Sequence, residues 1–189
     1  MYAACTAGTT TTGCSPKTPP PASPIPLPAK FDLGPGVFGG IESQLATNGS
    51  TTFAAVNNLA VPLSVKGVTE SSKAFEASIG KATGEMIAVN QETGKIEWDD
   101  QLPSTPYGAA AVTNNVVFTT TYNGNLYAFN ATTGAILLKT PLSAGTNAPV
   151  TIDGDYVIVG AGVAFTTGRA LIIAYKLGAK GKLPDTVGS

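Results

Sequence analysis

The chain has 189 residues, 43% of them hydrophobic and 12% charged, and its 11 basic and 12 acidic side chains leave a formal net charge of −1. This balance, with no basic stripe, argues against a nucleic-acid surface. Histidine is absent, which excludes His-based triads, His-ligated metals and imidazole acid–base chemistry within this chain; no apolar run is long enough to predict a transmembrane helix.

Residues 1–35 are predicted to form a disordered tail or linker rich in threonine and proline. Prolines are concentrated between Pro16 and Pro28, and that density favours extended polyproline II backbone over sheet ladders. Cys5 and Cys14 either close a small disulfide loop or remain two free thiols. Cys5 follows two alanines, the small-residue context of a lipidated cysteine, but no charged or apolar leader precedes it. A plain linker and a lipid tether both stay open.

Strand signals begin after Gly39 and outline a first four-stranded unit. Asn48-Gly49 is a strong hairpin signal, and Thr93-Gly94 marks a second turn. The four strands are expected at residues 41–46, 51–56, 84–90 and 95–98. Residues 57–83 lie between the second and third strands, and loops of that length are usually either functional or disordered.

A second unit follows, with strands expected at residues 108–113, 116–121, 125–130 and 135–139. The third unit has strands expected at residues 147–152, 156–160 and 169–176. Its fourth strand is predicted to be missing, because residues 178–184 are too rich in glycine, lysine and proline. Residues 179–189 are expected to form a C-terminal tail.

A repeat defines the fold class. The segment Ala88–Trp98 returns as Ala128–Leu138, 40 residues later (128 minus 88). Short strands and turns at that period are typical of a radial β repeat, and closed propellers have roughly 4–8 blades. Residues 36–178 are therefore predicted to form an all-β, partial β-propeller of about three four-stranded blades, the last incomplete. Gly94 and Gly134 are expected to supply a positive φ.

The repeated Ala-x-Asn-x-x-Thr-Gly pattern and the segment Gly39–Ser43 resemble the pyrroloquinoline quinone (PQQ) propeller family. The order of features over residues 36–178 is similar to the C-terminal blades of quinoprotein alcohol dehydrogenases. The resemblance implies a fold that, in the family's enzymes, holds PQQ beside Ca²⁺ or a lanthanide. Their metal ligands and catalytic Asp belong mostly to blades that would precede residue 36. Glu42 and Ser43 stand where those enzymes usually have Asn and Trp.

Glu42 is therefore the one candidate for cofactor contact, with a solvated turn-edge glutamate as the alternative; no catalytic or metal-binding residue is identified. Its carboxylate would face an already anionic quinone, which disfavours binding. The acidic run at residues 97–100 lacks the spacing of a calcium loop and is interpreted as a solvated strand end. Trp98 is expected to pack between neighbouring blades, and Leu138 to make the equivalent hydrophobic contact.

These features predict the C-terminal fragment of an extracytoplasmic PQQ-like β-propeller protein, whether periplasmic, secreted or surface-tethered. The fragment is expected to be non-catalytic on its own and to act as a scaffold or interaction surface for upstream blades or another protein, with no cofactor of its own. The alternative is part of a PQQ-dependent quinoprotein dehydrogenase that oxidises alcohols or related small molecules with PQQ and Ca²⁺. Glu42 and the insertion at 57–83 would then border the active-site mouth. A stand-alone oligomer that closes a ring from partial blades is a third hypothesis.

Overall fold

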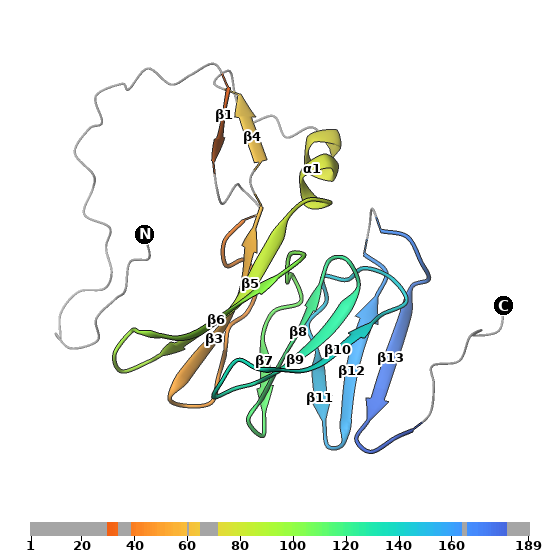
Figure 1. Ribbon diagram of the computed structural model, residues 1–189. Coiled ribbons are helices and arrows are strands. Elements are labelled where there is room, and N and C mark those ends of the chain that lie inside the picture. The colour runs from red at the N-terminus through yellow and green to blue at the C-terminus, as the bar shows by residue number, and fades with distance from the viewer. Residues whose placement is uncertain (1–29, 34–38, 60, 65–71, 164–165, 181–189) are drawn as a thin grey trace.

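The computed structural model describes residues 30–33, 39–59, 61–64, 72–163 and 166–180. Three antiparallel sheets follow one another along the chain as an arc (Figure 1). The first blade pairs its strands in the order β2 (Ala46–Thr47), β3 (Thr51–Asn58), β5 (Thr83–Asn90) and β6 (Ile96–Leu102). The second blade consists of β7 (Ala111–Thr113), β8 (Val116–Thr121), β9 (Asn125–Asn130) and β10 (Ile136–Pro141).

The third blade has three strands, β11 (Thr151–Asp153), β12 (Tyr156–Ala161) and β13 (Leu171–Lys176). Among the described residues, β13 has no further strand beside it, whereas the equivalent strands β5 and β9 pair with β6 and β10. The prediction of an all-β partial propeller with an incomplete last blade is confirmed.

A backbone hydrogen bond recurs at the same place in all three blades, so their residues can be aligned with one another. The amide after each third strand donates to the carbonyl before each second strand: Gln91 to Ser50 at 2.9 Å, Ala131 to Asn115 at 2.9 Å, and Leu177 to Asp155 at 2.7 Å. Residues at the same distance from these bonds therefore occupy equivalent places in the three blades.

The predicted turns are present. The Asn90 side-chain oxygen accepts hydrogen bonds from the amides of Glu92 and Thr93, and Asn130 binds the amides at 132 and 133 in the same way. Gly94 and Gly134 follow with φ of +68° and +76°, a conformation that glycine adopts without steric cost. Their expected positive φ is confirmed.

Apolar side chains fill the space between successive blades, where two sheets face each other. Between the first and second blades lies a cluster that includes Phe53, Met86, Trp98, Tyr127 and Phe129. A second cluster, built on Leu126, Val150 and Val159, joins the second and third blades. The alternation of side chains along each strand explains why neighbouring residues enter different clusters.

Several predicted boundaries need correction. Residues 41–46 were expected to be a strand, but only Ala46–Thr47 pair with β3. The insertion at 57–83 was expected to be loop, yet it contains β4 (Val61–Ser64) and the helix α1 (Ser72–Ile79). Strand β1 (Lys30–Leu33) pairs with β4 and lies inside the range predicted as tail. Residues 1–29, with Cys5 and Cys14, and residues 181–189 lie outside the described residues.

Candidate functional site

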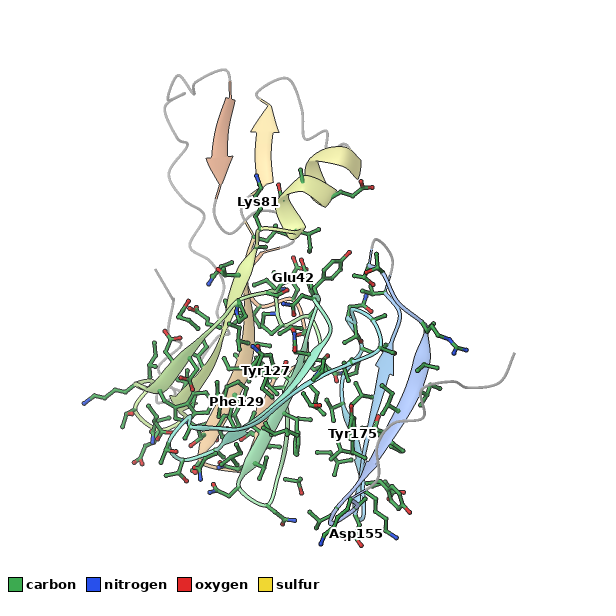
Figure 2. All side chains as sticks on the ribbon, turned by 45° about the vertical axis from the view of Figure 1, so that its right-hand side comes forward. Glu42, Lys81, Tyr127, Phe129, Asp155 and Tyr175 are labelled. Atoms are coloured by element: carbon green, nitrogen blue, oxygen red, sulfur yellow. The ribbon has the colours of Figure 1, made fainter. Side chains whose placement is uncertain are left out.

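The end of the blades nearest α1 carries the predicted site residue, Glu42, whose side chain is exposed (Figure 2). A pair of backbone hydrogen bonds positions the segment that leads to it. Gly40 N donates to Asn57 O at 2.8 Å, and Asn57 N donates to Gly40 O at 2.9 Å. This bridge attaches the segment containing Glu42 to the end of β3.

The bond that Asn57 N donates has an equivalent in each of the other two blades. The three bonds mark one level along the strands of the arc. Tyr122 N donates to Thr105 O at 2.9 Å, and Gly162 N donates to Gly145 O at 2.8 Å. Asn57, Tyr122 and Gly162 are therefore equivalent positions, one in each blade.

Two side chains at this level are buried with unused hydrogen-bonding capacity. Asn57 is 1% exposed and Thr105 is fully buried, and neither Asn57 Oδ1 nor Thr105 Oγ1 has a hydrogen-bond partner. An unsatisfied buried polar atom costs free energy, so these oxygens are candidate contacts for a bound group. Sequence analysis did not single out either residue.

The insertion covers the first two blades at this end. Ile79 at the end of α1 and Ala82 pack with Leu59 and with Tyr122 of the second blade. The rings of Tyr107 and Tyr122 meet edge to face, with centroids 6.2 Å apart. The structure therefore brings the insertion and Glu42 to the same end of the arc (Figure 2).

Tyr122 lies near one carboxylate at this end. Burial raises the pKa of the Tyr122 phenol, and the nearby Glu76 carboxylate on α1 raises it further. Both effects disfavour a negative charge on the phenol. Lys81 lies beyond α1 and lines a hollow of about 360 Å³ with Asn58 and Ala82.

A second hollow of about 350 Å³ opens where the second and third blades meet. It is lined by Tyr122, Asn123, the segment 142–145, Thr166 and Thr167. Its lining groups are neutral hydroxyls, an amide and backbone, so it has the chemistry to hydrogen-bond a small uncharged polar molecule.

The acidic run at residues 97–100 is divided between two faces of β6. Glu97 accepts hydrogen bonds from Thr51 Oγ1 at 2.9 Å and Asn90 Nδ2 at 3.0 Å. Asp99 accepts one from Gln101, while Asp100 Oδ2 is buried without a partner. Within the part of the chain that the structure describes, no three acidic or sulfur side chains gather as metal ligands.

Burial is the main cause that raises the pKa of both Asp99 and Asp100. Glu85 adds to the rise at Asp99, and the hydrogen bond from Gln101 opposes it. Asp99 in turn raises the pKa of Asp100. These shifts follow from burial and like charge rather than from a catalytic arrangement.

Trp98 packs between blades, as predicted. Its side chain is 9% exposed, and its ring lies 5.9 Å from Phe53 and 6.0 Å from Phe129, centroid to centroid. A β-bulge precedes it, because the ladder passes from the pair Val89–Ile96 to the pair Ala88–Trp98 and omits Glu97. Such a bulge re-aims the following side chain, here onto the second blade.

The expected hydrophobic contact of Leu138 is wrong: this side chain is 43% exposed. Trp98 reaches Ala131, in the Thr-Gly turn of the next blade. The equivalent of Ala131 in the third blade is Leu177, where the sequence has no Thr-Gly turn and the side chain is 80% exposed. Trp98 is covered by the Thr-Gly turn of the following blade, whereas Leu138 has no equivalent turn beside it among the described residues.

The described residues contain no helix that is long and apolar enough to cross a membrane. No curated protein sequence matches the chain.

Solved structures share the fold. The quinohemoprotein alcohol dehydrogenase from Comamonas testosteroni aligns with a TM-score of 0.65 at 22% identity, over 83% of this chain and 29% of that structure. The quinohemoprotein alcohol dehydrogenase ADHIIG from Pseudomonas putida aligns with a TM-score of 0.59 at 17% identity, over 78% and 28%. The chain thus spans less than a third of the length of either enzyme.

A family model described as "Outer membrane protein assembly factor BamB", of the PQQ-like repeat type, matches residues 82–176. That range covers the third and fourth strands of the first blade and both following blades. The repeat, the shared blade register and this match lead to one conclusion: the chain belongs to the PQQ-like β-propeller repeat family.

Proposed function

We propose that this chain is the C-terminal part of an extracytoplasmic PQQ-like propeller protein, and that it serves as a non-catalytic scaffold or protein-interaction surface. The observation that carries the proposal is the chemistry around Glu42. The matched family is described as an assembly factor of the outer membrane, which supports both a protein partner and a location outside the cytoplasm.

The residues at the Glu42 end do not fit PQQ. The quinone carries several carboxylates, and a site for it needs hydrogen-bond donors or cations. Here the exposed Glu42 carboxylate replaces an amide, and Glu76 makes the surroundings of Tyr122 less favourable to negative charge. Of the two buried oxygens without a partner, Asn57 Oδ1 can only accept, which leaves the Thr105 hydroxyl as the one donor of the pair. We therefore derive no step of a quinone reaction for this chain.

The second candidate function is that the chain forms part of a quinoprotein dehydrogenase, which oxidises alcohols with PQQ and Ca²⁺. One observation favours it: the insertion and Glu42 lie at the same end of the blades (Figure 2). Such an enzyme would need upstream blades to supply its metal ligands, its catalytic carboxylate and most of its cofactor contacts.

The test uses the native protein. An antibody against residues 84–140 detects it in fractions of the source cells, and the scaffold proposal expects it in an extracytoplasmic fraction as a species well above the 19.0 kDa of this chain. The purified native protein is then titrated with PQQ and Ca²⁺. Absence of saturable quinone binding supports the scaffold. Stoichiometric binding with alcohol oxidation establishes the dehydrogenase instead, and a cytoplasmic species overturns the proposed location.

A further inference from the structure

Three backbone segments enclose the hollow of about 350 Å³ between the second and third blades. They are the turn between β8 and β9, the connection from β10 to β11, and the described residues between β12 and β13, and the first and last of these lie at the same end of the blades (Figure 1). Leu142 N donates to Gly124 O, and Val163 N donates to Gly145 O, both at 2.9 Å. Backbone bonds thus fix the connection to the segments on both of its sides, so the hollow is preformed.

The equivalent place between the first and second blades is filled by the chain itself. There Leu59, Ile79 and Ala82 of the insertion pack against Tyr122. The alignment that places Thr105 with Gly145 also places Pro103 with Ser143. The second junction therefore differs from the first because it is open and because it carries a hydroxyl where the first has an apolar ring.

Two hydroxyl groups that line the hollow already use their protons. Ser143 Oγ donates to Arg169 O at 2.9 Å, and Thr166 Oγ1 donates to Val163 O at 2.7 Å. Both acceptors are backbone carbonyls, which cannot donate in return. Toward a bound molecule, the oxygens of Ser143 and Thr166 therefore act as acceptors.

The amide of Asn123 has the opposite polarity. Its Oδ1 accepts from Thr121 Oγ1 at 2.7 Å and from Asn125 Nδ2 at 2.9 Å. These two bonds occupy both lone pairs of Oδ1, so the Nδ2 group is what Asn123 offers to a bound molecule, and it donates. The hollow thus combines two acceptors and one donor whose roles the protein itself determines.

The remaining lining is apolar or neutral. Leu142 and Ala144 supply aliphatic surface, and Tyr122 supplies an aromatic ring. Burial raises the pKa of the Tyr122 phenol, and Glu76 raises it further, so this group is uncharged at neutral pH. Among the described residues that line the hollow, none is charged. A charged ligand would therefore lose hydration here without gaining a counter-charge.

We propose that this hollow binds a neutral sugar ring. Sugar hydroxyls both donate and accept, which matches Ser143 and Thr166 as acceptors and Asn123 as donor. The C–H faces of the ring contact Leu142 and Tyr122. A hollow of this volume lies within the usual range for small-molecule sites. Glu42 is not among the lining residues, and no bond of the sugar is made or broken, so this binding function goes beyond the scaffold role.

Calorimetric titration of the purified native full-length protein, without PQQ, tests the proposal. The neutral probes are glucose, galactose and mannose, and the comparison probes are gluconate, glucosamine and acetamide. At least one neutral hexose should bind saturably and more tightly than every comparison probe. The methyl glycoside of that hexose identifies the source of the ligand: equal or tighter binding assigns a sugar residue within a glycan, and weaker binding assigns a free sugar.

Three variants locate the binding. Ser143→Ala removes one acceptor and should weaken binding about three- to tenfold. Thr167→Phe fills the hollow from an exposed position on its rim and should abolish binding while the internal bonds of Ser143 and Thr166 are kept. The matched control, Thr132→Val, removes a hydroxyl that donates to Asn115 Oδ1 at 3.1 Å at the other end of β9, and should leave the affinity unchanged.

Thermal unfolding confirms that each variant is folded before it is titrated, and Thr167→Phe decides the matter if Ser143→Ala is unstable. Three results would overturn the proposal: no saturable binding of any neutral hexose, tighter binding of a comparison probe, or binding that survives Thr167→Phe. Because the titrations contain no quinone, such a result would leave the proposed scaffold function standing.

Discussion

The indole of Trp98 donates a hydrogen bond from Nε1 to the carbonyl oxygen of Ala131 at 2.9 Å, and this bond joins the outer strand of the first blade to a turn of the second. The bond is buried, and the same ring stacks on Phe129. A single side chain therefore contributes both an apolar contact and a polar contact between these two blades.

Replacing Trp98 should separate these two contributions. Trp98→Phe keeps most of the apolar contact but leaves the Ala131 carbonyl unpaired, which should lower the free energy of unfolding by about 1–2 kcal/mol. Trp98→Ala also creates a cavity and should cost about 3–5 kcal/mol. Urea denaturation measures both. Leu137→Ala, at a side chain 56% exposed, is the control and should change stability by about 0.5 kcal/mol or less; equal effects of all three would contradict this assignment.

Gly134 and Gly178 form a matched pair, because their φ values are +76° and +75°. A Cβ at Gly134 would lie 2.7 Å from Asp100 Oδ2 and 2.9 Å from Trp98 Cδ2, whereas at Gly178 it would meet nothing within 4 Å. Gly178→Ala should therefore cost only the left-handed backbone penalty of about 1–2 kcal/mol. Gly134→Ala should add about 1–3 kcal/mol from crowding. Thermal unfolding compares them, and equal losses would show that backbone conformation alone matters.

Asp100→Asn should stabilise the protein at neutral pH. The pKa of Asp100 is raised above its ordinary value of 3.8, so the folded state holds this proton more tightly than the unfolded state. The free energy of unfolding then falls as pH rises from 3.8 to the raised pKa and stays lowered above it. The amide removes this loss. Chemical denaturation between pH 3 and pH 7 should show a smaller decrease for the variant, and an unchanged pH profile would contradict the burial of this carboxyl.

Asn114 has φ of +45° in the tight turn between β7 and β8. Asparagine tolerates this region, but a β-branched residue does not. Asn114→Val should lower the free energy of unfolding by about 1–2 kcal/mol, and Asn114→Gly should be nearly neutral. Differential scanning calorimetry of the two variants checks the difference. Comparable melting temperatures for both would mean that the turn does not need a left-handed residue.

The sequence predicts the blades well because their information is local. Asn48-Gly49, Asn123-Gly124 and the two Thr-Gly turns each determine a hairpin over a few residues, and the repeat then places the hairpins in one register. The first strand was predicted too long because Ile41 and Leu45 look like strand residues. Both are about half exposed in the structure.

The candidate site was harder to predict because it depends on contacts between distant segments. Asn57, Thr105 and Tyr122 become equivalent or adjacent only after two blades have formed. The short helix α1 could have been recognised from its alanine, glutamate and lysine content, but nothing local indicates that Ile79 packs on Tyr122. Glu42 was identified from the family motif, and its role stays a prediction.

The pairing of Asn58 with Thr83 has a consequence for how this protein can change over evolution. The insertion leaves and re-enters the sheet at two residues that face each other across one ladder, so its length places no strain on the blade. The insertion is therefore a surface segment that can vary in sequence while the pairing of β3 with β5, which carries it, stays the same. Changes in this insertion that keep Leu59, Ile79 and Ala82 packed on Tyr122 would alter the surface near Glu42 while the stacking of the blades is preserved. The propeller can thus acquire new binding properties at this one junction without re-evolving its fold.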